Sequence, residues 1–247
     1  MSLLSVRDLD VHYGAVQALR GVSLEVNEGE IVSILGSNGA GKTTTLRTVS
    51  GLIKPSAGEI LFCDEQIGGL PAYEVIGRGL AHLPEGRDLF PTLTVEENLR
   101  FGYWTKRKDP NGYKDGLERA FTFFPKLAER RQQAAGTMSG GEQQMLGVAR
   151  ALMCRPKLLV VDELSLGLAP LIVQQLFEIL RKVNAEGTAL LIVEQFVHMA
   201  LENSHRAYVL AKGEVVLQGS SRDLLDDPEV IAAYLGESEA AASAGGR

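Results

Sequence analysis

The sequence predicts an α/β fold with a buried, mostly parallel sheet, a small antiparallel β layer at its edge and a helical segment inserted in mid-chain. Three observations support this prediction. A glycine-rich loop pattern stands between an apolar run and a helical run at residues 31–50, further apolar runs at 157–163 and 189–193 end in acidic or polar residues, and residues 91–154 have mostly helical spacing. The length of 247 residues allows one large domain or two small ones.

The antiparallel layer is predicted from two segments that alternate apolar and polar residues, 3–11 and 22–26, and from a short strand at 60–62. Tyr13 falls on the loop between the first two strands, where its ring could stack on a purine base. From the residues alone, a packing role is favoured for Tyr13.

The glycine-rich loop fits the pattern G-x-x-x-x-G-K-[ST], which is typical of loops that bind nucleotide phosphates. Its members are Gly36, Ser37, Asn38, Gly39, Ala40, Gly41, Lys42 and Thr43. Glycines let backbone N–H groups approach phosphate oxygens, Lys42 reaches the β- and γ-phosphates, and Thr43 offers its hydroxyl to Mg²⁺. Chance produces the pattern in roughly one chain per hundred of this length. Here, however, a strand-like run at 31–35 precedes it and a helical run at 44–50 follows it, so we expect a nucleotide site.

The middle of the chain is predicted to be helical at 95–99, 117–131 and 141–153. The polar stretch at 105–115 contains a proline and lies among glycines, which predicts a loop between the first two helices. These helices form an insertion between strands of the α/β core.

The core resumes with two apolar strands that end in Asp162 and Glu163 and in Glu194 and Gln195. The carboxyl ends of parallel strands are where ligands bind in open α/β sheets. Asp162 is placed to hold Mg²⁺ through water, and Glu163 to take a proton from an attacking water. Gln195 could contact the γ-phosphate or that water. The alternative is that the two acids only cap the next segment.

The chain is expected to end with a hairpin formed by residues 207–210 and 215–217, and then with a disordered tail at 237–247 that is rich in alanine, serine and glycine. The net charge of −6 and the short basic clusters argue against nonspecific binding of nucleic acid. Cys63 and Cys154 lack metal-type spacing and indicate buried thiols in a reducing compartment. There is no signal-peptide core or apolar run of membrane-spanning length, which predicts a cytosolic chain whose membrane role depends on a partner.

Residues 138–144, with the sequence Met-Ser-Gly-Gly-Glu-Gln-Gln, resemble the signature motif of ABC ATPases and lie about twenty residues before Asp162. The resemblance extends over residues 3–236 and implies a single ABC ATPase domain with a RecA-like P-loop NTPase core at 1–236 and a helical subdomain at about 91–154. It also implies that two cassettes meet head to tail. The residues of the motif that would face the nucleotide of the partner cassette are Ser139, Gly140 and Gly141.

Further motifs are similar to those of the ATP-binding subunit of branched-chain amino acid importers. They lie at residues 83–87, 90–91, 94–99, 136–138, 165–170 and 193–195. A urea or amide importer subunit is closely related and is harder to exclude on these motifs.

By the same resemblance, Tyr13 takes the position that stacks on adenine, which overturns the packing role favoured above. Lys42, Thr43 and Thr44 hold phosphates and Mg²⁺, and Glu163 becomes the general base. The segment from residue 86 to residue 101 begins the surface that receives a coupling helix from a membrane subunit.

Four residues depart from the general ABC pattern. Glu85 stands where most of these ATPases have a glutamine after the third core strand, and its charge would bind Mg²⁺ more strongly. Gln195 stands where a histidine usually contacts the γ-phosphate. Ala169 replaces an aspartate that reaches across the dimer. These three occur in the branched-chain subfamily, whereas Leu164, which replaces the proline after Glu163, has no explanation from the sequence.

The resemblance implies an enzyme that binds ATP and Mg²⁺ and hydrolyses ATP to ADP and phosphate to drive amino acid uptake. Its implied partners are a second, usually different, cassette, two transmembrane permease subunits and, indirectly, a periplasmic substrate-binding protein. Such a chain is cytoplasmic and peripheral on the inner face of the membrane. Two alternatives stay open: a slow nucleotide-sensing subunit paired with a more active cassette, and a soluble ABC ATPase that acts on DNA or ribosomes.

Overall fold

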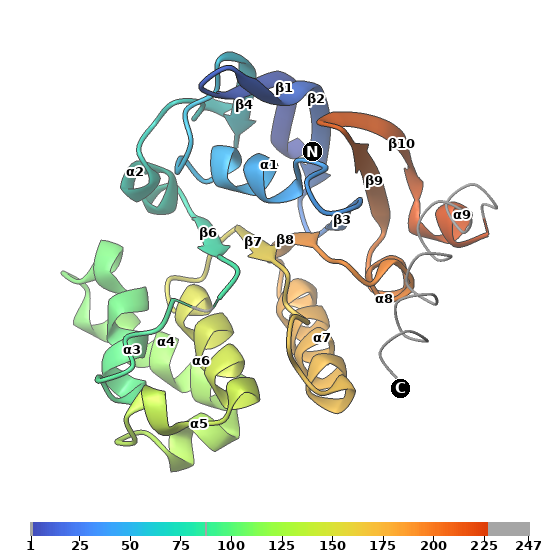
Figure 1. Ribbon diagram of the computed structural model, residues 1–247. Coiled ribbons are helices and arrows are strands. Elements are labelled where there is room, and N and C mark those ends of the chain that lie inside the picture. Colours follow the sequence, from blue (N-terminus) through green and yellow to red (C-terminus); the bar gives the residue numbers. More distant parts are fainter. Residues whose placement is uncertain (1, 87, 227–247) are drawn as a thin grey trace.

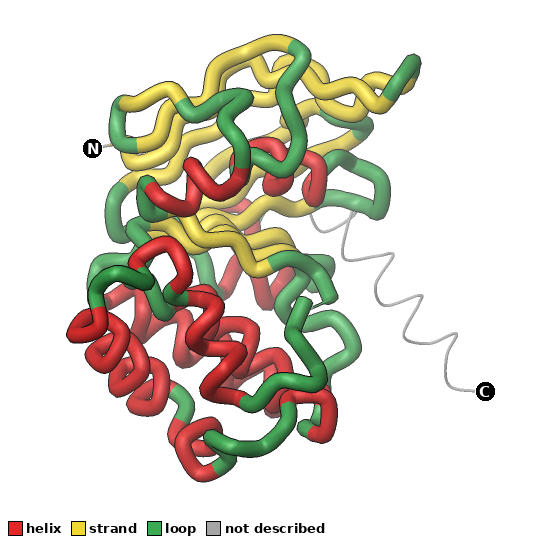
Figure 2. Tube along the Cα trace, turned by 90° about the vertical axis from the view of Figure 1, so that its left-hand side faces the viewer, coloured by secondary structure: helices red, strands yellow, loops and turns green. Residues whose placement is uncertain are grey.

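The computed structural model describes residues 2–86 and 88–226 and has an antiparallel sheet, a mainly parallel core sheet and a group of helices below it (Figure 1). Seen from the side, helix α1 (Lys42–Val49) lies between the two sheets, and most other helices lie beneath the core sheet (Figure 2). These layers confirm the predicted α/β fold. The predicted tail at 237–247 and Arg87 lie outside the described residues.

The antiparallel sheet has the strand order β2 (Val16–Asn27), β1 (Ser2–Tyr13), β4 (Ala57–Phe62) and β5 (Glu65–Gln66). Buried residues alternate with exposed ones along the second half of β2, as expected for a sheet with one face on the core and one in water. The strand predictions are confirmed, but β1 and β2 are longer than the alternation indicated. Tyr13 is the last residue of β1 and not part of a loop, since its Cα is still paired with that of Val16.

The core sheet has the strand order β10 (Glu214–Ser220), β9 (Arg206–Ala211), β3 (Ile31–Leu35), β8 (Ala189–Val193), β7 (Leu158–Asp162) and β6 (Leu80–Leu83). All neighbours are parallel except β9 and β10, which form the predicted hairpin. Every residue of β3, β7 and β8 is buried, because both faces of the sheet are covered.

Successive residues of the core strands pack into different clusters. Val160 and Leu191 face α1 and the antiparallel sheet, whereas Leu159 and Leu190 face the helices on the other side. This alternation follows from the two-residue period of a strand. It places α1 and the helical region on opposite faces of the same sheet.

The helical region consists of α3 (Val95–Gly102), the 3₁₀ turn η1 (Trp104–Lys106), α4 (Pro110–Phe123), α5 (Pro125–Glu129), the 3₁₀ turn η2 (Ala135–Thr137) and α6 (Gly140–Leu152). The loop predicted at 105–115 is wrong from residue 110 onward. The Asp109 carboxylate caps α4 by accepting a hydrogen bond from the Gly112 N–H at 2.9 Å, and Pro110 occupies the first helical position, where it needs no hydrogen bond. The helix predicted at 117–131 is two helices, because Pro125 starts a new one.

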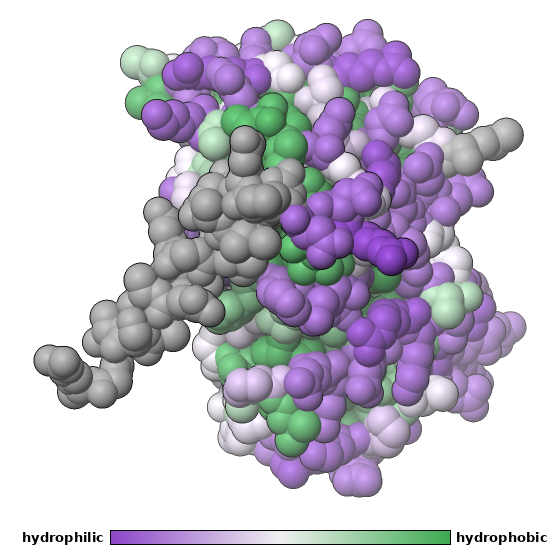
Figure 3. All heavy atoms as spheres, turned by 90° about the vertical axis from the view of Figure 1, so that its right-hand side faces the viewer, coloured by the Kyte–Doolittle hydropathy of each residue, from purple (hydrophilic) through white to green (hydrophobic). Residues whose placement is uncertain are grey.

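The remaining helices are α2 (Ala72–Gly77), α7 (Pro170–Ala185), α8 (Val197–Glu202) and α9 (Ser221–Leu225). Helix α7 packs Leu176, Phe177 and Leu180 under the core sheet beside the helical region. The side of the molecule that carries β10, α8 and α9 is mostly hydrophilic, with apolar residues between the polar ones (Figure 3). None of the described helices has both the length and the apolar character needed to cross a bilayer.

Candidate nucleotide-binding site

The predicted site residues converge because their strands are neighbours. Strands β3, β8 and β7 are adjacent and parallel, so the segments that follow them lie at the same edge of the sheet. This edge receives the loop at 36–41, the pair Asp162 and Glu163, and the pair Glu194 and Gln195. It is the edge at which ligands bind in open α/β sheets.

The backbone of the loop at 36–41 needs glycine at two positions. Gly36 and Gly41 have positive φ angles of 150° and 108°. A Cβ atom would lie 2.3 Å from the Leu210 carbonyl oxygen at Gly36 and 2.6 Å from a methyl carbon of Leu19 at Gly41. Both distances are far below normal contact, so side chains are excluded where the loop passes the core.

Lys42 is the first residue of α1, and its side chain folds back over the loop. Its Nζ donates hydrogen bonds to the carbonyl oxygens of Gly36 at 2.8 Å and Ser37 at 3.2 Å. Burial lowers the pKa of Lys42, while the nearby carboxylates of Glu163 and Asp162 act in the opposite direction. The first turn of α1 carries no acidic residue, so the positive end of this helix is free to act on an anion in the loop.

Thr43 and Asp162 form the other side of the site. The Thr43 hydroxyl donates to Asp162 Oδ1 at 3.2 Å, whereas the buried Oδ2 has no hydrogen-bond partner among the described residues. The pKa of Asp162 is raised to about 6, mainly by burial and in addition by the nearby carboxylates of Glu163 and Glu85. A hydroxyl, an unsatisfied carboxylate oxygen and surplus negative charge are what a hard cation such as Mg²⁺ requires. The residues present therefore fit Mg²⁺ held together with phosphate oxygens and water.

Glu85 and Glu163 lie close enough to Asp162 to affect its pKa. Glu85 is exposed on the turn after β6, and Glu163 is half-buried directly after β7. Glu163 adopts a left-handed conformation with φ of 49°, and its N–H donates to the Val193 carbonyl oxygen at 3.0 Å. The next residue, Leu164, is fully buried in the helical side of the core, which explains an apolar residue there but not the absence of proline.

A contact that the sequence did not predict connects the ends of β7 and β8. The Glu194 carboxylate is fully buried and accepts hydrogen bonds from the Ser165 hydroxyl at 2.6 Å and the Ser165 N–H at 3.2 Å. Burial raises the pKa of Glu194 to about 7. Gln195 is exposed at the same edge. The sequence shows an acid at the end of an apolar strand, but it gives no sign that the partner of this acid lies 29 residues earlier.

Tyr13 lies at the open side of the site and is 50% exposed. Its hydroxyl is 3.5 Å from the Thr44 hydroxyl in the first turn of α1. The ring thus stands beside the helix that opens at the loop, with surface free for another planar group.

Ser139, Gly140 and Gly141 do not join this group. Ser139 caps α6, with its hydroxyl and N–H both bonded to the Glu142 carboxylate at 2.9 Å. Helix α6 packs on the face of the sheet opposite to α1. In the described chain no hydrogen bond or ion pair connects Ser139 with the loop at 36–41. A hollow of about 300 Å³ next to Ser139 is lined instead by the segment 167–169.

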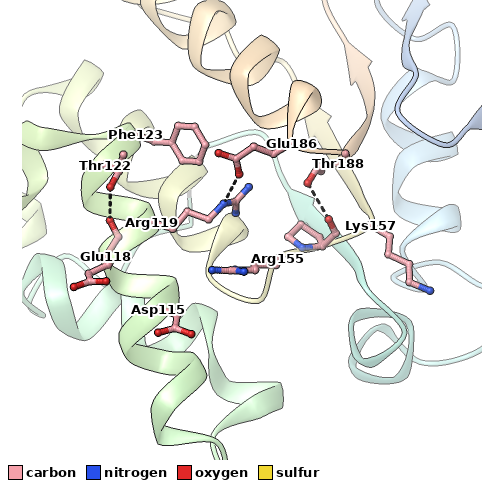
Figure 4. Close-up of a pocket in the computed structure, with 11 residues that line it drawn as sticks. Asp115, Glu118, Arg119, Thr122, Phe123, Arg155, Lys157, Glu186 and Thr188 are labelled. Atoms are coloured by element: carbon pink, nitrogen blue, oxygen red, sulfur yellow. Dashed lines mark hydrogen bonds and ion pairs between the residues drawn. The ribbon is translucent and has the colours of Figure 1, made fainter.

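Another hollow lined by charged residues lies elsewhere, at the amino ends of β7 and β8 (Figure 4). It has a volume of about 590 Å³ and is lined by acidic and basic side chains alike. Across it, Arg119 of α4 pairs with Glu186 at the end of α7 at 2.7 Å. This ion pair connects the helical region to the core, and the mixed charge gives the hollow no preference for an anion or a cation.

The fold and the glycine-dependent loop together define a phosphate-loop nucleotide-binding protein. Residues 19–165 match the family model described as ABC transporter, so this chain belongs to the ABC transporter family. It is 47% identical to the high-affinity branched-chain amino acid transport ATP-binding protein BraG of Pseudomonas aeruginosa, and the match covers 95% of this chain and 100% of that protein.

Solved structures agree with this assignment. The fold is similar to that of MJ1267, an ATP-binding cassette of an ABC transporter in its ADP conformation, with a TM-score of 0.84, 28% identity and coverage of 96% and 99% of the two chains. It is also similar to MJ0796, a bacterial ABC transporter cassette with a dimeric structure, with a TM-score of 0.80, 25% identity and coverage of 89% and 99%. The fold of this chain is therefore that of an ABC cassette.

Proposed function

We propose that this chain binds Mg²⁺ and ATP and hydrolyses ATP to ADP and phosphate as the ATP-binding subunit of an importer for branched-chain amino acids. The observation that carries the enzymatic part is the Thr43–Asp162 contact beside the loop, with Asp162 Oδ2 buried and unpaired. The amino acid class rests on the 47% identity to BraG. The same similarity favours this substrate over the urea and amide alternatives.

In the proposed reaction, backbone N–H groups of the loop and the Lys42 ammonium hold the phosphates, and Tyr13 stacks on the adenine. Thr43 and Asp162 would hold Mg²⁺, with Glu85 beside them, and the bound ion would neutralise charge on the phosphate oxygens. Glu163 accepts a proton from the attacking water, and the Gln195 amide donates to a γ-phosphate oxygen. Asp162 and Glu163 keep separate roles because one is buried against Thr43 and the other is half-buried.

A second cassette would complete the site. Gly140 and Gly141 are the first two residues of α6, where backbone N–H groups have no partner within the helix and favour an anion. Ser139 lies apart from this chain's own loop, so the anion would be the γ-phosphate bound by a partner. The likeness to a dimeric cassette supports this proposal.

Membrane partners would bind at an exposed aromatic surface made by Phe90, Phe101 and Trp104. The ring centroids of Phe90 and Phe101 are 4.6 Å apart, and those of Phe101 and Trp104 are 6.2 Å apart. All three rings are 42–57% exposed. A cluster of this kind on a surface marks an interaction site. We place one of the two permease subunits here, which would keep the chain on the cytoplasmic face of the membrane, with the periplasmic binding protein acting from the other side.

The test is the Glu163→Gln variant in the transporter assembled with its permease. Removing the proton acceptor should lower ATP turnover by about 10²–10⁴-fold while ATP binding is kept. In the cassettes without the permease, the nucleotide-bound dimer should then accumulate and be detected by size-exclusion chromatography. Unchanged hydrolysis would rule out the role proposed for Glu163.

The control is Lys42→Ala, which should weaken ATP binding itself because the phosphates lose their cation. The two variants thus separate loss of chemistry from loss of binding. If wild-type transporter bound ATP but showed no hydrolysis, the enzymatic proposal would be wrong.

A further inference from the structure

Glu194 is a buried carboxyl group whose position the reaction outlined above does not explain. It is 0% exposed, and no ion pair of the described residues includes it. Its hydrogen-bond donors are the N–H and hydroxyl of Ser165 and the backbone N–H of Gln195. Burying a carboxyl group is costly, so hydrogen bonds of this number are needed to keep it inside.

These bonds connect two segments that carry reacting groups. Ser165 follows Glu163 by two residues, and Glu194 directly precedes Gln195. The same two segments are joined by a backbone bond from the Glu163 N–H to the Val193 carbonyl oxygen at 3.0 Å. The carboxyl ends of β7 and β8 are therefore held together beyond the last paired residues of the strands, Asp162 and Val193.

The connection also reaches the surface that would face a second cassette. Ser165 begins the segment whose residues 167–169 line the hollow beside Ser139. Within this segment the Leu168 N–H bonds to the Ser165 carbonyl oxygen at 3.2 Å, so the position of Ser165 sets that of the turn. Leu166 is exposed and adds little anchoring.

We propose that Glu194 is a positioning residue, whose bonds to Ser165 fix Glu163, Gln195 and the partner-facing segment 165–169 relative to one another. This inference rests on the proposed ATPase function, because it concerns how the groups of that reaction are aligned. A displacement of reacting groups by about 1 Å can lower the reaction rate by as much as about 10²-fold. Loss of the Glu194 contact would displace Glu163 and Gln195 in this way but would not move the groups that hold the phosphates. Glu194 acts on turnover and not on nucleotide affinity.

The experiment measures kcat and KM for ATP in the assembled transporter, with thermal unfolding recorded for each variant. Glu194→Ala should lower kcat by about 10–100-fold and leave KM within about twofold, because Lys42 and the loop are unchanged. Glu194→Gln keeps the side-chain length, and its amide can accept from the Ser165 N–H and donate to the Ser165 hydroxyl. It should therefore restore kcat to within about threefold of wild type.

Ser165→Ala removes one of the bonds and tests the connection from the other side. It should lower kcat in the same direction, and the double variant Glu194→Ala, Ser165→Ala should be no slower than Glu194→Ala alone, since residues that act through one contact are not additive. If Glu194→Ala fails to fold, the other two variants test the proposal. A lower kcat in Ser165→Ala with near wild-type kcat in Glu194→Gln would support the positioning role, and wild-type kcat in Ser165→Ala would contradict it.

The matched control is Thr188→Val, at the opposite end of β8. The Thr188 hydroxyl is also buried and donates to the Pro156 carbonyl oxygen at 3.0 Å. Losing this bond should lower the melting temperature without changing kcat. Wild-type kcat in Glu194→Ala, or equal changes in kcat and KM, would overturn the positioning role while leaving ATP hydrolysis by wild type intact. Absence of hydrolysis in wild type would instead overturn the proposed function, and the inference with it.

Discussion

Two buried ionisable side chains, Asp162 and Glu194, and the partly buried His82 lie in or just after neighbouring strands of the core sheet, and burial moves the pKa of each in the direction that favours the neutral form. The pKa rises to about 6 for Asp162 and to about 7 for Glu194, and it falls to about 4 for His82. The consequences differ, because Asp162 lies beside the proposed Mg²⁺ position whereas His82 has one side-chain hydrogen bond within the described residues. The His82 Nδ1 lies 2.9 Å from the Ser50 hydroxyl, and its Nε2 is buried without a partner in the described residues.

His82 should make the protein sensitive to acid. Its folded-state pKa of about 4 lies below the ordinary value of 6.5, so between these values the unfolded chain binds the extra proton. Stability from this residue is complete above pH 6.5 and is lost as the pH falls toward 4. At pH 5 the loss is about 2 kcal/mol. Urea unfolding at pH 7 and pH 5 measures this change.

The comparison variant is His82→Asn, whose amide can keep the bond to Ser50 but does not titrate. The difference between the two pH values should shrink by about 2 kcal/mol in this variant relative to wild type. An equal pH dependence in both proteins would contradict the assignment to His82.

Among the helices and strands, α3 shows how one buried side chain fixes a neighbouring segment. Asn98 is fully buried and donates to the carbonyl oxygens of Phe90, Leu93 and Thr94, while its side-chain oxygen accepts from the Phe90 N–H at 2.9 Å. One amide side chain therefore ties the turn before α3, which carries one ring of the aromatic surface, to the helix, and backbone bonds from Ala135 and Gly136 add to it.

Replacing Asn98 by Leu should destabilise the protein by about 2–3 kcal/mol, because the Phe90 N–H loses its acceptor and the carbonyl oxygens of Phe90, Leu93 and Thr94 each lose a donor. Urea unfolding at constant pH checks this value. Thr122→Ala is the control, since its hydroxyl bond to the Glu118 carbonyl oxygen at 2.9 Å is exposed and its loss should cost less than about 0.5 kcal/mol. A similar small change for Asn98→Leu would show that water replaces the amide.

The elements with simple patterns could be predicted from the sequence, and those that depend on distant contacts could not. Strands β3 and β8 match their apolar runs residue for residue, because continuous apolar runs are typical of strands buried on both faces. Helix α4 was partly missed because its first turn is polar and depends on the Asp109 cap. Helix α7 was not predicted, although Pro170 at its first position is a start signal.

The site could be predicted where its functional residues directly follow the carboxyl ends of apolar strands. The loop at 36–43 and Asp162 meet because β3 and β7 both pair in parallel with β8, so that their carboxyl ends lie at one edge of the sheet. Apolar strands that end in polar residues predict such an edge even when the strand order is unknown. The Glu194–Ser165 contact could not be inferred, since it also requires β7 and β8 to be direct neighbours. The position of Ser139 relative to a partner cassette is likewise a property of two chains.

In the whole molecule, the proposed nucleotide-binding site and the proposed permease-binding surface lie on different parts of the fold. The nucleotide groups lie at the carboxyl edge of the core sheet, while the aromatic surface belongs to the segment around α3 and η1. Glu85 on the turn after β6 and Phe90 belong to one short connection between these parts. A signal between nucleotide and permease would pass through this connection, and each contact should be removable without loss of the other.

Replacing Phe101 and Trp104 together by Ala should therefore abolish co-purification with the permease in detergent and transport-coupled ATPase activity. ATP binding by the isolated chain should stay within about twofold, because neither ring contacts the loop at 36–43, and exposed side chains contribute less than about 0.5 kcal/mol to stability. Val216→Ala is the matched control: this residue is 56% exposed on β10, at the opposite end of the core sheet from β6. It should assemble as wild type does. Full assembly without the two aromatic rings would contradict the aromatic surface as the permease contact, since removal of exposed apolar area at the true interface must weaken binding.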